Sequence, residues 1–163
     1  MRIRTVKFNF IMNAILTVSS ILFPLITFPY ISRVLLVEGS GKVAFATSVV
    51  SYFTMFATLG IPTYGIRECA RVRDNKEELS RTVQELLIIS GITTAITYGV
   101  FFLLLFVVPQ FRGQKELLIV IGASIGLTTI GVQWFYSALE QYSYITVCAV
   151  LFKIIGLILM FLL

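Results

Sequence analysis

The distribution of charged residues constrains this chain more than any other feature. Four long runs contain no charged residue, and each exceeds the ~20 residues that a helix needs to cross a ~30 Å hydrocarbon layer. These runs are Phe8–Ser32, Val43–Ile66, Leu86–Phe111 and Leu117–Leu139. A fifth run, Gln141–Leu163, is interrupted by Lys153 alone. The sequence therefore predicts a polytopic membrane protein.

Composition supports the same class. Of the 163 residues, 58% are hydrophobic and 13% are charged, about half the ~25% charged residues of soluble domains. These values exclude a water-soluble fold, a disordered chain and a disulfide scaffold. In lipid, a helix satisfies its own backbone hydrogen bonds. We therefore expect an all-α integral membrane fold, one domain with five transmembrane helices over residues 8–32, 43–62, 86–108, 117–137 and 144–163.

Basic residues predict the orientation of these spans. The N-terminus carries Arg2, Arg4 and Lys7, and the charged segment 63–85 carries Arg67, Arg71, Arg73, Lys76 and Arg81. The opposite side carries Arg33, Lys42, Arg112 and Lys115. Lys and Arg accumulate on the cytoplasmic side of membrane proteins. We therefore expect the N-terminus and the segment 63–85 in the cytoplasm.

Several residues indicate where helices bend, start and stop. Pro24 and Pro29 predict a kink or an unwound turn in the first span. Residues 63–73 are expected to form an interfacial helix. Asp74-Asn75 offers an N-cap for a long third helix, which reaches Val108 and which Pro109 ends.

Small residues recur at four-residue spacing in two predicted spans. Gly91, Ala95 and Gly99 lie in the third span, and Gly122 and Gly126 lie in the fourth. Such spacing allows helix backbones to approach closely in lipid. We expect the two runs to form a contact face between these spans.

Lys153 is the most anomalous residue of the chain. If the last span starts near Tyr144, Lys153 lies roughly 14 Å into a ~30 Å core. A bare ammonium there is costly and usually marks a cavity, a partner or a pathway. The alternative is that its aliphatic stem snorkels to the cytoplasmic interface. Arg33 is open to two interpretations as well, an anion site at the mouth of a pathway or, preferred, an interfacial anchor.

The remaining polar and aromatic groups near the inner interface have structural interpretations. Segment 67–85 is expected to be a solvated helical face with local ion pairs such as Glu77–Arg81. Trp134, Tyr136, Tyr142 and Tyr144 resemble an aromatic belt, with sugar stacking as the alternative.

Enzymatic chemistry is not expected. The sequence has no histidine, and its eight acidic residues lie in or beside the predicted loops, so no catalytic site, metal site or cofactor is predicted. The net charge of +5 reflects topology and anionic lipid head groups rather than nucleic acid.

Several strings resemble Wzx-type O-antigen and capsule flippases of the multidrug/oligosaccharidyl-lipid/polysaccharide (MOP) exporter superfamily. The strings are FPYISRVL from Phe28, EGSGK from Glu38, LGIPTYGIRE from Leu59, RVRDNK from Arg71, WFY from Trp134 and EQY from Glu140. One departure is Leu36-Val37, where such proteins commonly have Gly-Pro.

The resemblance implies two helical lobes around a cavity, of which this chain supplies most of the N-terminal one. It implies alternating-access flipping of undecaprenyl-pyrophosphate-linked oligosaccharide across the bacterial cytoplasmic membrane, for O-antigen, capsule or exopolysaccharide synthesis. Arg33, Arg67 and Lys153 are the expected pyrophosphate-binding residues. The implied partners are the lipid-linked oligosaccharide, membrane lipid, and a glycan polymerase or glycosyltransferases.

Five helices are fewer than one lobe, so we expect an N-terminal fragment of a longer transporter that is inactive alone. Two alternatives stay open. One is a fragment of a multidrug exporter, which would more naturally carry a carboxylate within a span. The other is a small, non-transporting membrane protein that assembles with glycan-synthesis enzymes.

Overall fold

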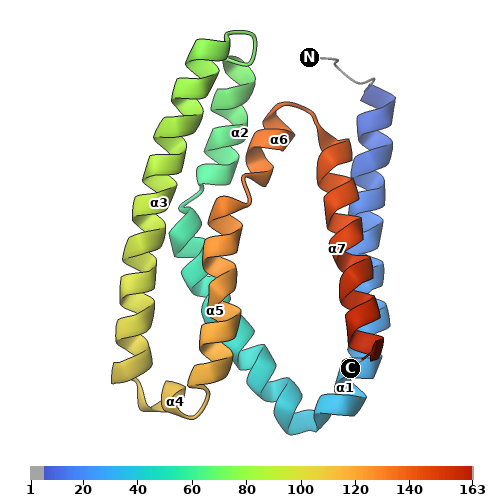
Figure 1. Ribbon diagram of the computed structural model, residues 1–163, viewed down its shortest axis with the longest axis vertical. Helices are drawn as coiled ribbons and strands as arrows, with labels where there is room; N and C mark the ends of the chain where they lie inside the picture. Colours follow the sequence, from blue (N-terminus) through green and yellow to red (C-terminus); the bar gives the residue numbers. More distant parts are fainter. Residues whose placement is uncertain (1–5, 163) are drawn as a thin grey trace.

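The computed structural model describes residues 6–162, which form helices connected by short turns (Figure 1). The helices are α1 (Val6–Thr58), α2 (Ile61–Arg71), α3 (Lys76–Val107), α4 (Pro109–Arg112), α5 (Lys115–Ile130), α6 (Gln133–Ala138) and α7 (Tyr142–Leu162). No strand occurs within residues 6–162, so the predicted all-α class is confirmed. Arg2 and Arg4, on which the predicted orientation partly rests, lie outside the described residues.

Four segments of residues 6–162 are long and apolar enough to cross a membrane. They are Lys7–Arg71, Lys76–Val107, Lys115–Ala138 and Tyr142–Leu162. The all-α membrane class therefore holds, while the expected number of five crossings is not confirmed by this count. The first segment differs from the others, because its 65 residues are about three times the length that a single crossing needs.

A sharp bend at Leu36 divides α1 into two arms. Leu36 has φ 55° and ψ −176° inside an otherwise helical segment. Figure 1 shows that the chain reverses its direction there, so that the first arm (residues 6–35) and the second arm (residues 37–58) form a V. The expected unwound turn at Pro24 and Pro29 is not observed, because both keep helical dihedral angles. The break expected between the first two spans, over residues 33–42, is confined to Leu36 in a segment that is otherwise helical. A proline φ near −65° fits a helix, whereas a reversal needs a residue that leaves helical dihedral angles.

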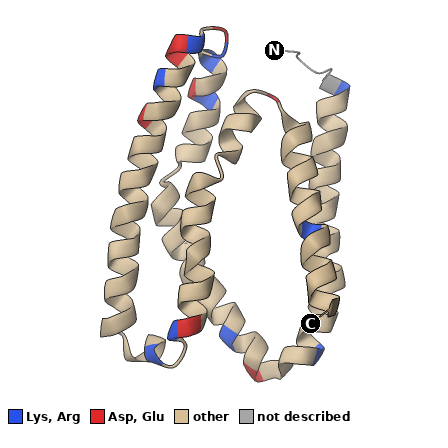
Figure 2. Cartoon of the chain, in the orientation of Figure 1, with Lys and Arg blue, Asp and Glu red and all other residues tan. Residues whose placement is uncertain are grey.

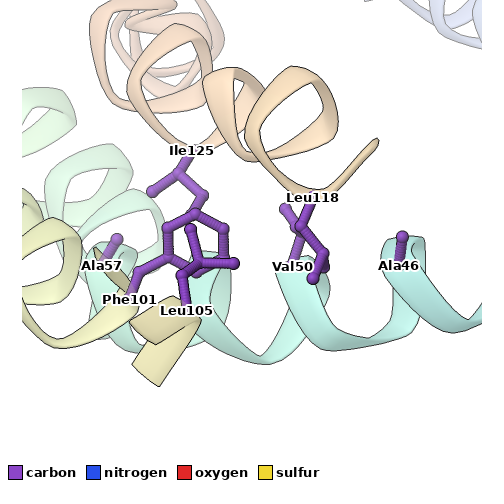
Figure 3. Packing of buried hydrophobic residues seen from close by; sticks show 7 residues of the cluster. All are labelled: Ala46, Val50, Ala57, Phe101, Leu105, Leu118 and Ile125. Atoms are coloured by element: carbon purple, nitrogen blue, oxygen red, sulfur yellow. The ribbon is translucent and has the colours of Figure 1, made fainter. Parts of the chain in front are cut away.

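The main hydrophobic core lies between the second arm, α3 and α5. Its buried members are Ala46, Val50, Ala57, Phe101, Leu105, Leu118 and Ile125. Figure 3 shows Leu118 directed toward Val50, with the Phe101 ring close to Ile125. The bend at Leu36 is what returns the second arm to this core.

A second core joins α2, α6 and the start of α3. Ile61, Cys69, Leu86, Trp134 and Ala138 are its buried residues. Trp134 is 8% exposed, so it belongs to this core rather than to the expected aromatic belt. A Cβ atom at Gly65 would lie 2.6 Å from the Trp134 ring. Only glycine therefore allows α2 to approach the indole so closely.

Of the two small-residue runs expected to form a contact face, the run on α5 makes the close contact and the run on α3 does not. A Cβ atom at Gly122 would lie 2.9 Å from the Phe101 ring, and one at Gly126 would lie 3.0 Å from the Tyr98 hydroxyl. Gly91 and Gly99 face no heavy atom within 4 Å, so the small-residue run on α3 is not the other half of this contact. The glycines of α5 receive aromatic side chains of α3 instead of a second small-residue surface.

The predicted boundaries of the long helix are confirmed. The Asn75 side chain accepts hydrogen bonds from the backbone N–H groups of Glu77 and Glu78 at the start of α3. The helix ends at Val107, two residues before Pro109. Downstream, α5 ends at Ile130 and a turn at Gly131-Val132 precedes α6.

Replacing Leu36 with glycine should stabilise the protein. Its φ and ψ lie near a region that is essentially accessible to glycine alone and costs other residues about 1–3 kcal/mol. Part of that gain is lost because glycine is more flexible in the unfolded chain. We expect Leu36→Gly to raise the free energy of unfolding by about 1 kcal/mol in a denaturing titration in detergent micelles. Val37→Gly is the matched control and should lower it.

Replacing Gly122 with alanine should destabilise the contact between α3 and α5. The Phe101 ring is 1% exposed and has no room to move away from the added methyl group. We expect a loss of about 1–3 kcal/mol in the same titration. Gly91→Ala, at a position with open space around it, should cause no loss. Equal effects of the two substitutions would contradict this packing.

Candidate functional site

The first arm of α1 packs against α7 in a parallel orientation. The Thr146 hydroxyl of α7 donates to the Met12 carbonyl at 3.0 Å. Further along, Phe23 lies next to Gly156, and the rings of Tyr30 and Phe161 make an edge contact at 5.3 Å between centroids. The two helices therefore run side by side in the same direction over most of their length (Figure 1).

Lys153 lies at the centre of this helix pair. Its ammonium group donates hydrogen bonds to the hydroxyls of Ser19, at 3.0 Å, and Ser20, at 2.9 Å. Both serine hydroxyls in turn donate to the Leu16 carbonyl at 2.8 Å. The serine oxygens are thus held in place to accept from the lysine, and the side chain is half-buried.

The position of Lys153 differs from that of the other charged residues. Figure 2 shows basic and acidic residues gathered at the two ends of the molecule, and a basic position along α7 departs from that pattern. Lys153 is the one charged residue between Tyr142 and Leu162. Because α7 carries no other charged residue, Lys153 has no ion-pair partner on its own helix. Its polar contacts are the two serine hydroxyls of α1.

The other two predicted site residues lie elsewhere. Arg33 is exposed near the end of the first arm, three residues before the bend, and Arg67 is exposed on α2. Neither has a hydrogen-bond or ion-pair partner among the described residues. The structure therefore does not bring Lys153, Arg67 and Arg33 together: they lie on α7, on α2 and near the end of the first arm of α1.

Ser19 and Ser20 are functional-site candidates that the sequence did not single out. Fourteen serine and threonine residues occur in the first three predicted spans, and most bond only to their own helix, as Ser48 does with the Ala44 carbonyl. The sequence signal that could have identified this site is the adjacent Ser-Ser pair, which places two hydrogen-bond acceptors at the same height along a helix. Its pairing with a lysine 133 to 134 residues away has no local sequence signal.

The ion pairs of the charged end also differ from expectation. Arg81 pairs with Glu85 at 3.0 Å rather than with Glu77. An ion pair of longer range joins Arg73, after α2, to Glu140, before α7, at 3.3 Å. This second pair connects two turns that are far apart in the sequence.

Two cavities lie near α6. One of about 680 Å³ is bordered by Arg73, Leu79, Val83, Phe135 and Glu140. The other, of about 380 Å³, lies between the end of α5, α6 and α7 and includes the stacked rings of Tyr136 and Tyr144. Lys153 lines neither cavity. Within residues 6–162, no group of three or more His, Cys, Asp or Glu residues could hold a metal ion.

Removing both serine hydroxyls should destabilise the helix pair through Lys153. The variant Ser19→Ala/Ser20→Ala leaves the ammonium without these acceptors, and we expect a loss of about 1–3 kcal/mol in the free energy of unfolding. In a Lys153→Met background the same double substitution should cost much less. Equal costs in the two backgrounds would show that the serines act independently of the lysine. Ser48→Ala is the matched control.

Comparisons with known proteins identify the family of the chain. Residues 6–163 match the family described as "Polysaccharide biosynthesis protein". The chain is also 22% identical over 146 residues to a protein of Escherichia coli (strain K12) described as "Putative O-antigen transporter". That alignment covers 90% of this chain and 35% of the relative, so the chain spans about a third of that protein's length. No solved structure matches the chain.

Proposed function

The chain belongs to the polysaccharide biosynthesis protein family, and from this premise we propose that it is the N-terminal part of a flippase. Its cargo in this proposal is an undecaprenyl-pyrophosphate-linked oligosaccharide, which moves from the cytoplasmic to the outer leaflet for the synthesis of O-antigen, capsule or exopolysaccharide. Family membership and the similarity to a transporter favour transport over enzymatic chemistry.

The observation that carries this proposal is the ammonium of Lys153 within an apolar helix pair. An ammonium has three donors, and the two serine hydroxyls take two of them. A third donor is thus available for an anionic ligand, and a pyrophosphate cannot enter apolar surroundings without such a partner. In the proposal, Lys153 binds the pyrophosphate within the membrane. Arg67 and Arg33 would act at other stages, because neither contacts Lys153 or its two serines.

The proposal includes a topology. The five spans cover residues 8–32, 43–62, 86–108, 117–137 and 144–163 of a bacterial cytoplasmic membrane protein, with the N-terminus and segment 63–85 inside. The two arms of α1 support the first two spans, because they run in opposite directions from the bend (Figure 1). The charged turn between α2 and α3 supports a water-facing location for segment 63–85 (Figure 2).

A complete transport pathway requires a second helical bundle. Alternating access needs two bundles that rock about a shared site, and this chain corresponds to 35% of its relative. We therefore propose that the described helices form most of one lobe and do not flip lipid alone. A glycan polymerase or glycosyltransferases would be partners of the complete transporter.

The proposed function is tested by changing Lys153 in the transporter that carries this chain. In a bacterial strain without its own flippase, Lys153→Ala should abolish surface display of the glycan, because no cation compensates the pyrophosphate charge. Lys153→Arg should retain part of the display. The measurement is surface glycan by antibody binding, normalised to the transporter level in the membrane.

Two controls separate binding from folding. Ser48→Ala should leave glycan display unchanged, and Lys153→Ala should reach the membrane in normal amounts. Normal display with Lys153→Ala would refute the assignment of this residue. Normal display by the 163-residue chain in the absence of any further lobe would refute the proposal that the chain is inactive alone.

A further inference from the structure

The first arm of α1 and α7 form a unit that is separate from both hydrophobic cores. The buried and partly buried members of the two cores come from the second arm, α2, α3, α4, α5, α6 and the turn before α6. None of them belongs to residues 6–35 or 142–162. Contacts within the unit keep a nearly constant register, with hydrogen-bonded residues 133 to 134 positions apart.

The chain joins this unit to the rest of the molecule at two points, and both have left-handed backbone. Leu36, at the end of the first arm, has φ 55°, and Glu140, two residues before α7, has φ 56°. Positive φ is uncommon for residues other than glycine. Outside the unit, Leu59, which links α1 to α2, has φ 41°, and Val132, before α6, has φ 13°.

The two junctions lie at opposite ends of the molecule. Figure 1 shows the bend of α1 at one end and the turn between α6 and α7 at the other, with the helix pair between them. A line through both junctions therefore runs along the pair. Rotation about that line changes dihedral angles at few residues and leaves the contacts inside the pair intact, as in a hinge motion.

An ion pair lies at one of the two junctions. The Glu140 carboxylate accepts from Arg73 at 3.3 Å, and both side chains are about half exposed, at 47% and 41%. Arg73 follows α2, so this contact ties the junction to the body of the molecule. The cavity of about 680 Å³ lies directly beside the ion pair, with apolar walls at Leu79, Val83 and Phe135.

We propose that the first arm of α1 and α7 turn as one rigid unit about hinges at Leu36 and Glu140, and that the Arg73–Glu140 ion pair locks the second hinge. The stack of Tyr136 in α6 and Tyr144 in α7, at 4.5 Å between centroids, lies across this hinge. The inference rests on the two junctions and the ion pair, and does not depend on the transported substrate.

Distances between spin labels in the intact protein, in lipid nanodiscs, test the hinge. Labels at Val120 of α5 and Leu151 of α7 measure the unit against the body, and labels at Ile26 of α1 and Ile155 of α7 measure the unit itself. All four positions are at least half exposed. The native Cys69 and Cys148 are first replaced by alanine. Distance distributions are then compared for the parent, Arg73→Gln and Glu140→Gln.

We expect Arg73→Gln and Glu140→Gln to raise the population of displaced Val120–Leu151 distances about twofold to fivefold, which is the range set by an exposed ion pair. The Ile26–Ile155 distance should stay unchanged. The charge exchange Arg73→Glu/Glu140→Arg should restore the parent distribution. Arg81→Gln, which removes an exposed pair away from the hinges, is the matched control.

Two results would overturn the proposal. An unchanged Val120–Leu151 distribution in both single variants would show that the ion pair is not a lock. Equal broadening of both label pairs would show that the first arm and α7 do not form a rigid unit. Because an exposed ion pair contributes little to overall stability, both variants should remain folded, and circular dichroism verifies this in each sample.

Discussion

The reversal of the backbone at Leu36 determines how the rest of the chain is arranged. Without it, α1 would continue as one helix of 53 residues, far longer than a bilayer is thick. With it, the second arm returns to pack on α3 and α5, while the first arm is left free to pair with a helix from the far end of the sequence. Both hydrophobic cores and the paired helices follow from that division.

The surroundings of Lys153 show how a helix bundle keeps a charge in apolar surroundings. The usual solution is a carboxylate partner, which would cancel the positive charge and leave no attraction for an anion. Two serine hydroxyls satisfy donors of the ammonium without neutralising it. The arrangement therefore leaves the positive charge available and lowers the free-energy cost of holding it between α1 and α7. A residue that binds an anion needs an available charge, whereas the charge of a structural ion pair is already neutralised.

Local patterns in the sequence predicted local structure well. The charge-free runs located the long helices, because lipid accepts few other elements, and Asn75 and Pro109 located the ends of α3 because capping depends on neighbouring residues. The break between the first two spans was predicted over residues 33–42, because charged residues interrupt the apolar runs there. Its restriction to Leu36 was not predicted, since leucine shows no preference for left-handed backbone. Trp134 was expected in an aromatic belt at the membrane interface. Its packing on Gly65 could not be predicted, because the two residues are 69 positions apart in the sequence. For the same reason, the sequence did not predict the contact of Lys153 with Ser19 and Ser20. The three basic residues of the expected site, Lys153, Arg33 and Arg67, were grouped by charge rather than by position.

The parallel pairing of α1 with α7 also affects how the protein is made. The two sides of this contact are 134 residues apart, so at about 5–20 residues per second a ribosome needs roughly 7 to 27 s to synthesise the second after the first. During that interval the Ser19 and Ser20 hydroxyls lack their contact with Lys153. Within this chain α1 is therefore made well before its partner α7, and a chaperone or insertase that holds α1 would have most influence in this period.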